Sequence, residues 1–353
     1  MIQSVEIKNF KCLKDFQIDL GKFNVLIGPN DSGKTAFLHA LLVISVTGMQ
    51  GRLLLKDTAS KAGIELGEFV WNGAKTGSVF LTVRGIPQAS LSIPAASGTV
   101  TLPRPDHANP PSFASNLLSE DGKFLKLDDR APDGSEWTRY WFSKVVGKAS
   151  YYRFSPSALR ADSPMIGNLQ MSVMGQGLPT FLEEFLRSDR RGFFAMEEDF
   201  SERFPEYGIQ IEKVGGNNSL KFKARSGQLL GAGDVSDGVL FYLAFLAITH
   251  QPNSPQILLI EEPENGVHHA RLEQIVRALK DVAKRKGVQV CLTTHSPYLV
   301  DLVEPEDVRV FQKDPKDGSV TARPLTSFKD VDEMKKHFMS GEIWTMLSEK
   351  EGV

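Results

Sequence analysis

Hydrophobic and polar residues alternate at the start of the chain before the pattern changes to unbroken apolar runs. Residues 4–7 and 16–20 alternate with the period of half-buried strands, whereas residues 23–27 form an apolar run typical of a fully buried strand. After a glycine-containing loop, residues 34–46 have the length and apolar character of a buried helix. The start of the chain therefore predicts three strands followed by a helix.

A second series of apolar segments lies in the last third of the chain. The pattern predicts a dense apolar helix over residues 238–249, a buried strand over 257–260, an amphipathic helix over 269–286 and another strand over 288–293. A strand, a helix and a strand joined by short loops form a right-handed parallel unit. We therefore expect the two ends of the chain to share one α/β sheet.

The middle of the chain has a different character. Residues 49–147 are rich in Gly, Pro, Ser and Asp, and 78–83 is their clearest strand candidate. Further on, the pattern predicts a strand over 151–154, helices over 178–186 and 196–203, and a hairpin of 209–214 and 219–224 around the turn 215–218. The expected parts are residues 1–48, an inserted lobe over 49–227, a part over 228–303 that completes the sheet, and a C-terminal extension over 304–353.

Composition and charge narrow the class of protein. The 353 residues are 41% hydrophobic and 24% charged, which is enough for a large core and argues against disorder. Lys and Arg total 41 against 43 Asp and Glu, so binding to nucleic acid or membrane requires a local patch. Cys12 and Cys291, both in strand-like apolar surroundings, are too few for a disulfide framework. No secretion signal or apolar run of bilayer length is seen, so we expect a soluble cytoplasmic protein without membrane contact.

One loop matches a phosphate-binding pattern in which two glycines bracket four residues and precede Lys and Ser or Thr. Its residues are Gly28, Pro29, Asn30, Asp31, Ser32, Gly33, Lys34 and Thr35. The loop follows a predicted strand and opens a predicted helix, so its N–H groups and the helix N-terminus favour phosphate. We expect Lys34 to contact the β- and γ-phosphates of ATP and the Thr35 hydroxyl to bind Mg²⁺. The ordinary alternative is a glycine turn before a helix.

Two carboxylates end the predicted strand over residues 257–260. Ligands of open α/β sheets bind at the carboxyl edge of parallel strands, where Glu261 and Glu262 are expected. Glu261 is a candidate for the metal, through water, and Glu262 for the general base that activates the attacking water. A solvated acidic turn after a core strand is the alternative.

Two further segments belong to the same prediction. His295 follows the next strand, where a neutral imidazole can contact a γ-phosphate or orient water, although a single His after a strand is more often structural. Ser236, Asp237 and Gly238 open the helix over 238–249, and helix capping alone is an equally good explanation for these residues. That helix N-terminus also offers N–H donors for a second phosphate.

The order of these motifs resembles the ATP-binding cassette head of the SMC, RecF and OLD-like group. The resemblance covers residues 1–47, where the opening over 5–14 is similar to the first hairpin of that group, and residues 228–303, with the middle matched only in outline. It implies a P-loop α/β ATPase with a mostly parallel core sheet, an N-terminal antiparallel β lobe and an inserted α/β lobe. It further implies that Ser236 and Gly238 act as a signature motif on a nucleotide held by the opposite subunit, that residues 264–269 lie beside the dimer contact, and that Lys11 lies near the nucleotide.

The sequence departs from that group in two places and lacks two of its larger parts. Many related ATPases carry Asp at the position of Glu261, and neither Gln170 nor Gln176 has a pattern that identifies it as the Gln-loop residue. Residues 49–228 show no heptads for the long coiled arms of SMC proteins. The segment after His295 lacks an acidic metal cluster, so we expect no nuclease within the chain.

Three functional hypotheses follow. The first is an ATPase that associates with itself through the ATP site and acts on DNA in repair or anti-phage defence with a separate effector. Lys221, Lys223 and Arg225 alternate along one strand face and could follow a phosphate backbone, although such faces more often serve solubility or edge protection. The second is an ATP-dependent scaffold that holds and releases a toxin or nuclease without binding DNA. The third, a transporter ATPase, is disfavoured by the opening hairpin and by the Glu-Glu-Pro-Glu sequence.

Trp137 and Trp141 are expected in the core rather than as platforms for base stacking.

Overall fold

The chain folds into two compact units. The computed structural model describes residues 1–50, 52–54, 76–83, 86–94, 99–100, 115–116, 124–126, 149–165, 170–252, 254–329 and 331–351. Unit 1 comprises Met1–Tyr151, Pro255–Leu259 and Gln289–Val353, and unit 2 comprises Tyr152–Ser254 and Ile260–Val288. Most of the loop-rich part predicted over 49–147, with Trp137 and Trp141, lies outside the described residues.

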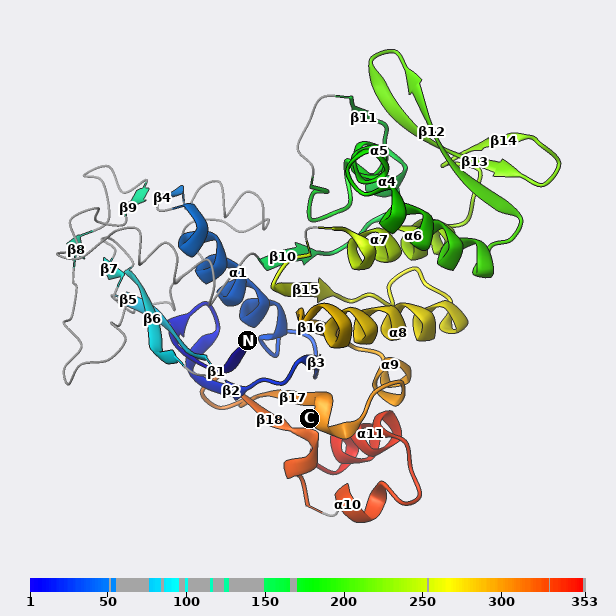
Figure 1. The fold of residues 1–353 in the computed structure, drawn as a ribbon. Coiled ribbons are helices and arrows are strands. Elements are labelled where there is room, and N and C mark those ends of the chain that lie inside the picture. The colour runs from blue at the N-terminus through cyan, green and yellow to red at the C-terminus, as the bar shows by residue number, and fades with distance from the viewer. Residues whose placement is uncertain are drawn as a thin grey trace. The chain divides into compact units, whose positions relative to one another are not determined.

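A six-stranded sheet joins segments from both ends of the chain. Its order is β10 (Ala149–Tyr152), β15 (Ile257–Glu261), β16 (Gln289–Thr294), β3 (Phe23–Ile27), β17 (Val308–Lys313) and β18 (Val320–Pro324). β3 pairs in parallel with β16 and β17, whereas β18 is antiparallel to β17. All residues of β3, β15 and β16 are buried, which explains why their sequences are largely apolar. The shared sheet predicted from the sequence is confirmed (Figure 1).

An antiparallel sheet forms the second layer of strands in unit 1. It has the order β2 (Leu13–Asp19), β1 (Ile2–Phe10), β5 (Thr76–Val83) and β6 (Ile86–Pro94). The alternating pattern of the first hairpin corresponds to buried side chains on one face, with Ile7 opposite Phe16. Two short pairs accompany it, β4 (Arg52–Leu54) with β9 (Phe124–Lys126) and β7 (Thr99–Val100) with β8 (Ser115–Asn116).

Helix α1 (Lys34–Gln50) follows β3 and packs into the core of unit 1. The rings of Phe16, Phe37 and Phe311 meet with centroid distances of 5.4 to 6.0 Å, which joins β2, α1 and β17. The C-terminal part adds short helices and one longer helix. These are α9 (Pro297–Asp301), η2 (Pro305–Asp307), η3 (Leu325–Ser327), α10 (Val331–Met334) and α11 (Ser340–Glu351).

Unit 2 is built around the apolar helix α7 (Asp237–His250). Its residues from Val239 to Thr249 are all buried, because α4, α6 and α8 pack against it. The other elements are α4 (Pro156–Arg160), β11 (Ser163–Pro164), α5 (Leu178–Ser188), α6 (Arg190–Arg203), β12 (Tyr207–Val214), β13 (Asn217–Ala224), β14 (Leu229–Gly231) and α8 (His269–Lys286). Within the described residues, no helix combines the length and the apolar character that a bilayer crossing requires.

In unit 2, the hairpin turn and helix α6 have boundaries that differ clearly from the sequence prediction. The hairpin turn contains only Gly215 and Gly216, whose φ angles of 56° and 84° suit a tight two-residue turn, rather than the four residues expected. Helix α6 begins at Arg190 instead of residue 196, because the Asp189 side chain accepts a 2.9 Å hydrogen bond from the Gly192 N–H and caps the helix.

Candidate nucleotide-binding site

The phosphate loop lies between the end of β3 and the start of α1, as the sequence predicts. A Cβ atom at Gly28 would lie 2.3 Å from the carbonyl oxygen of Phe311, so the loop can approach β17 only with glycine there. Gly33 has a φ of 90°, and Asp31 is also left-handed with a φ of 61°. The loop is therefore held in a tight curve by positions that favour glycine or Asp.

Lys34 brings a buried positive charge into this loop. Its side chain is 5% exposed, and Nζ donates to the carbonyl oxygens of Gly28 at 2.8 Å and Pro29 at 2.7 Å and to Ser32 Oγ at 3.3 Å. A buried ammonium needs such partners to offset its lost hydration. Anionic phosphate oxygens can replace these three neutral oxygens with a gain in charge pairing.

The strand order brings three predicted motifs to neighbouring strands. Ile27 and Thr294 are register partners at the ends of the parallel strands β3 and β16, so the phosphate loop and His295 leave the sheet at the same edge. β15 is the next strand after β16, and its last residue is Glu261. The phosphate loop, His295 and the two carboxylates therefore lie at the ends of three successive strands of the sheet, β3, β16 and β15.

The two carboxylates at the end of β15 have different environments. The Glu261 side chain is buried, and its Oε2 lies 3.7 Å from Nε of the half-exposed Arg153. Glu262 adopts a left-handed backbone with a φ of 46°, and its Oε2 accepts a 2.6 Å hydrogen bond from Asn265 Nδ2. A non-glycine residue in this conformation stores backbone strain, which is common at functional sites.

His295 is held between two well-defined elements. It directly follows the buried strand β16, and the next residue, Ser296, is the N-cap of α9. The Ser296 N–H donates to Thr294 Oγ1 at 2.9 Å, and Ser296 Oγ accepts from the Leu299 N–H at 3.4 Å. These bonds restrict the backbone on both sides of His295, which is half-buried.

A separate cluster in unit 2 fixes the Ser-Asp-Gly segment. Arg160 donates to the carbonyl oxygens of Ala232 at 3.2 Å and Val235 at 3.3 Å and forms an ion pair with Asp237. Ser236 is the exposed N-cap residue of α7, but its hydroxyl makes no capping hydrogen bond. Arg160 thus orders the loop. The Ser236 hydroxyl does not cap the helix, although the sequence alone would suggest that it does.

Lys11 and Cys12 lie in the turn of the first hairpin. Nζ of Lys11 is 3.0 Å from Nδ1 of the buried His39 on α1, one helical turn after Thr35. Cys12 lies in the same turn, between β1 and β2, and its side chain is half-buried. The expectation that Cys12 has strand-like apolar surroundings was therefore wrong. Burial, followed by the nearby Asp31, raises the pKa of the Cys12 thiol.

The protein groups available for a metal are oxygen donors. Within the described ranges no cluster of three or more His, Cys, Asp or Glu side chains could hold a metal by itself. Mg²⁺ commonly takes only one or two protein ligands and completes its shell with phosphate oxygens and water. The Thr35 hydroxyl and the Glu261 carboxylate have the hard-oxygen chemistry that such a site requires.

Several residues of these clusters escaped the sequence analysis. Arg153 contacts Glu261 and Arg160 contacts Asp237, yet no motif contains either arginine. Asn265 lies in the loop over 264–269 that the family resemblance singled out, but its contact with Glu262 was not predicted. The proximity of these residues to the carboxylates results from the fold, and no motif or period in the sequence indicates it. Lys313 of β17, which pairs with Asp31 of the phosphate loop, was missed for the same reason.

Comparisons with known proteins agree with this fold. A family model described as "AAA domain, putative AbiEii toxin, Type IV TA system" matches residues 113–301, and a second, described as "AAA ATPase domain", matches residues 1–70. The chain is 22% identical to an OLD nuclease of Thermus scotoductus, covering 97% of the chain and 68% of that protein. It is also 22% identical to an ATP/GTP phosphatase of Helicobacter pylori, covering 86% of the chain and 88% of that protein.

Solved SMC head domains share the fold. A head bound to the C-winged helix domain of ScpA has a TM-score of 0.58 at 15% identity and covers 95% of this chain and 99% of its own. A head with an extended coiled coil, bound to the C-terminal domain of ScpA derived from Pyrococcus furiosus, has a TM-score of 0.52 at 14% identity and covers 95% and 99%.

The first family model spans more than half of the chain, and the observed sheet and phosphate loop match the architecture that the sequence predicted. The resemblance to the OLD and SMC group is thereby confirmed. The chain belongs to the AAA-domain family and is an ATPase of the OLD- and SMC-like type.

Proposed function

We propose that this ATPase binds ATP with Mg²⁺ at the phosphate loop and uses the bound nucleotide to pair two copies of the chain. The observation that carries the proposal is the buried Lys34 ammonium, enclosed by loop oxygens at the edge of the sheet where His295 also emerges. A buried charge in a glycine-shaped loop is poorly explained as a solubility feature. It suits an incoming polyphosphate that replaces the loop carbonyls.

Each remaining residue of the site takes a role that its chemistry permits. The loop from Gly28 to Thr35 surrounds the phosphates, with Lys34 on the β- and γ-phosphates. Thr35 and Glu261 hold Mg²⁺, which when bound neutralises charge on the phosphates. Glu262 accepts a proton from the attacking water, and His295 hydrogen-bonds the γ-phosphate. When the nucleotide binds, Lys11 leaves its contact with His39 and contacts the nucleotide instead.

The arrangement of Ser236 supports a site completed by a second copy. Its hydroxyl is exposed and makes no cap, while Arg160 keeps the segment ordered. An ordered helix N-terminus with an uncommitted hydroxyl and Gly238 beside it is suited to a γ-phosphate held by the partner. Hydrolysis in a single copy would then be slow, because half of the site is absent.

Pairing is tested by measuring molar mass with Glu262→Gln, which should retain ATP while slowing its hydrolysis. Light scattering should give a dimer with Mg²⁺ and ATP and a monomer without nucleotide. Adding Ser236→Arg should abolish the ATP-dependent dimer, whereas Ser226→Arg, at another exposed serine, should not. An ATP-bound protein that remains monomeric at every concentration would contradict the pairing. If the protein is dimeric throughout, crosslinking through Ser236→Cys must depend on ATP for the proposal to stand.

We further propose that DNA is the target, with a separate effector, in repair or anti-phage defence. Lys221 and Lys223 share one face of β13, opposite the buried Phe222. Arg225 lies one residue beyond the strand, and its Nε donates to the Pro205 carbonyl oxygen at 3.0 Å, so it is less free to contact a backbone than the alternating pattern suggested. The two lysines therefore carry most of the proposed DNA contact.

The DNA proposal is tested by titrating DNA at several salt concentrations. The triple variant of Lys221, Lys223 and Arg225 to Ala should bind more weakly and lower the slope of log affinity against log salt by about 2, since each lost phosphate contact contributes ~0.9. A control triple variant at the exposed Lys14, Lys22 and Lys316 should bind as the wild type does. Equal binding by the two triple variants, or no DNA binding by the wild type, would exclude this target.

The alternative, a scaffold that holds and releases a toxin or nuclease, has one specific observation in its favour. The family model that matches residues 113–301 carries a toxin and a type IV toxin–antitoxin system in its description. The net charge of −2 also gives no general attraction to DNA. ATP-dependent capture of a protein partner, together with absent DNA binding, would favour this alternative.

A further inference from the structure

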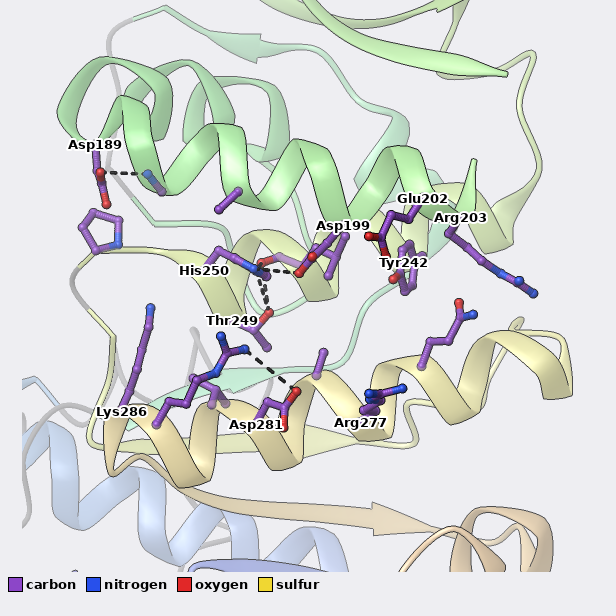
Figure 2. Close-up of a pocket in the computed structure, with 18 of the residues that line it drawn as sticks. Asp189, Asp199, Glu202, Arg203, Tyr242, Thr249, His250, Arg277, Asp281 and Lys286 are labelled. Carbon is purple, nitrogen blue, oxygen red and sulfur yellow. Dashed lines mark hydrogen bonds and ion pairs between the residues drawn. The ribbon is translucent and has the colours of Figure 1, made fainter. Parts of the chain in front are cut away.

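A large polar cleft lies within unit 2, between helices α6, α7 and α8. Its volume is about 880 Å³, within the usual range for small-ligand sites. Figure 2 shows Asp199 and Glu202 extending from α6, Asp281 and Lys286 from α8, and Tyr242 and His250 of α7 between them. The cleft shares no residue with the proposed ATP site.

Cationic side chains gather toward opposite ends of this cleft. One end carries Arg285 and Lys286 at the C-terminus of α8, and the other carries Arg203 and Arg277 (Figure 2 labels three of these four). Arg277 and Lys286 are nine residues apart on α8, or about 14 Å at the helical rise. A single phosphate is too small to meet both ends.

The arginines at the second end have unused hydrogen-bonding capacity. In the part of the chain that the structure describes, neither Arg203 nor Arg277 forms an ion pair, and the buried Nε of Arg203 has no hydrogen-bond partner. The buried Oε1 of Gln274, which also lines the cleft, likewise lacks a donor. The cleft lining therefore contains one unpaired donor and one unpaired acceptor, which suits a ligand that offers both an anionic oxygen and a hydroxyl or amine.

Like charges oppose one another at each end. Burial, followed by the adjacent Arg285, lowers the pKa of Lys286. Burial, followed by Arg203, lowers the pKa of Arg271, which stacks 4.4 Å above the Phe204 ring near the second end. An anion at either end would offset this repulsion between like charges.

The middle of the cleft is unsuited to a continuous polyanion. Asp199 pairs with His250 Nε2 at 3.0 Å, and Asp281 lies 3.9 Å from Arg285, while Glu202 adds a further carboxylate. These acidic groups would repel a nucleic-acid backbone that carries charge at every step. They favour a ligand whose middle is neutral and donates hydrogen bonds.

We propose that the cleft between α6, α7 and α8 binds a small phosphorylated molecule of about nucleotide size, with anionic groups at both ends and hydrogen-bond donors between them. Arg203 and Arg277 bind one anionic end, and Arg285 and Lys286 bind the other. Gln274 and the central carboxylates accept hydrogen bonds from the middle of the ligand. Because this ligand contacts three helices at once, its binding rigidifies their packing around α7.

The test measures binding of two probes by calorimetry, adenosine 3′,5′-bisphosphate and fructose 1,6-bisphosphate, which each carry two phosphate groups separated by a neutral sugar. At least one should bind wild-type protein with a Kd below roughly 1 mM. The Arg203→Gln/Arg277→Gln and Arg285→Gln/Lys286→Gln variants should each weaken that binding by about tenfold or more. The control variant Arg187→Gln/Lys284→Gln removes two exposed charges outside the cleft and should bind the probe as the wild type does. The melting temperature of each variant is measured to verify that it folds.

The Lys34→Ala variant separates this proposal from the ATP site. Probe binding should survive in Lys34→Ala, because the cleft contains no part of the phosphate loop. Binding that is lost in Lys34→Ala but kept in both cleft variants would assign the probes to the phosphate loop and overturn the proposal. The proposal would also be overturned if neither probe binds. It would equally be overturned if a single-stranded oligonucleotide of about 20 nucleotides is the only ligand whose binding depends on the cleft arginines.

Discussion

The Lys34 ammonium donates a 2.7 Å hydrogen bond to the carbonyl oxygen of Pro29, so the phosphate loop encloses its own buried cation. Removing that cation should weaken ATP binding strongly. We expect Lys34→Ala to raise the Kd for ATP about 100-fold or more, because a charge-assisted contact to two phosphates is lost. Equilibrium binding of a fluorescent ATP analogue measures the change. Lys22→Ala, at an exposed lysine just before β3, is the matched control and should bind normally.

A single buried amide joins the N-terminal strand to the central sheet. Gln289 Oε1 accepts from the Ile2 N–H at 2.9 Å, and its Nε2 donates to the carbonyl oxygens of Ile2 at 2.7 Å and Gly21 at 2.8 Å. Gln289→Leu leaves these backbone groups without that partner, so the free energy of unfolding should fall by about 2–4 kcal/mol. Urea denaturation of this variant and of the exposed Gln17→Leu would test it. Equal stability of the two would show that the amide bridge contributes nothing.

The C-terminal helix α11 contacts α9 through a glycine. A Cβ atom at Gly341 would lie 2.1 Å from the carbonyl oxygen of Pro297, and the Gly341 N–H donates to Asp301 Oδ1 at 2.6 Å. We expect Gly341→Ala to destabilise the protein by about 1–3 kcal/mol, since backbone atoms cannot move aside cheaply. Thermal unfolding provides the measurement. Gly233→Ala, where nothing lies within 4 Å of the new methyl group, should be close to neutral, and a similar loss in both would refute the steric explanation.

The two thiols should differ in reactivity and in their effect on stability at high pH. Complete burial raises the pKa of Cys291 from 9.0 to about 12, so its thiolate is scarce in the folded protein. Maleimide should therefore modify Cys12 slowly and Cys291 only after unfolding, as mass spectrometry of the intact and denatured protein can determine. Because the unfolded chain loses the Cys291 proton first, stability should decline between pH 9 and about 12, and Cys291→Ser should reduce that slope. Rapid labelling of Cys291 in folded protein would contradict this.

The fold was predictable where hydrophobic period and motif coincide. Phe23–Ile27 and His269–Lys286 have the bounds expected from the sequence, since an unbroken apolar run and an amphipathic period each leave little choice of structure. The phosphate loop and the shared sheet were also predictable from local pattern and short connections. The start of α6 was missed because Asp189 was not recognised as its N-cap.

The supporting contacts of the site were not predictable. Arg160 and Asp237 are 77 positions apart, and their ion pair depends on how α4 packs against α7. Lys313 and Asp31 are separated by 282 positions and meet because β17 pairs with β3. Such contacts arise from tertiary packing and leave no periodic or motif signal in one sequence. The same is true of the cleft arginines, which came from two helices with no shared motif.

In the proposed mechanism, ATP bound at the phosphate loop is hydrolysed with Glu262 as the base. The most direct test measures ATP affinity and single-turnover hydrolysis for Glu262→Gln, with the exposed Glu273→Gln as control. We predict that Glu262→Gln binds ATP within about threefold of the wild type but hydrolyses it at least ~100-fold more slowly, while the control matches the wild type. Hydrolysis by Glu262→Gln at the wild-type rate would contradict the account.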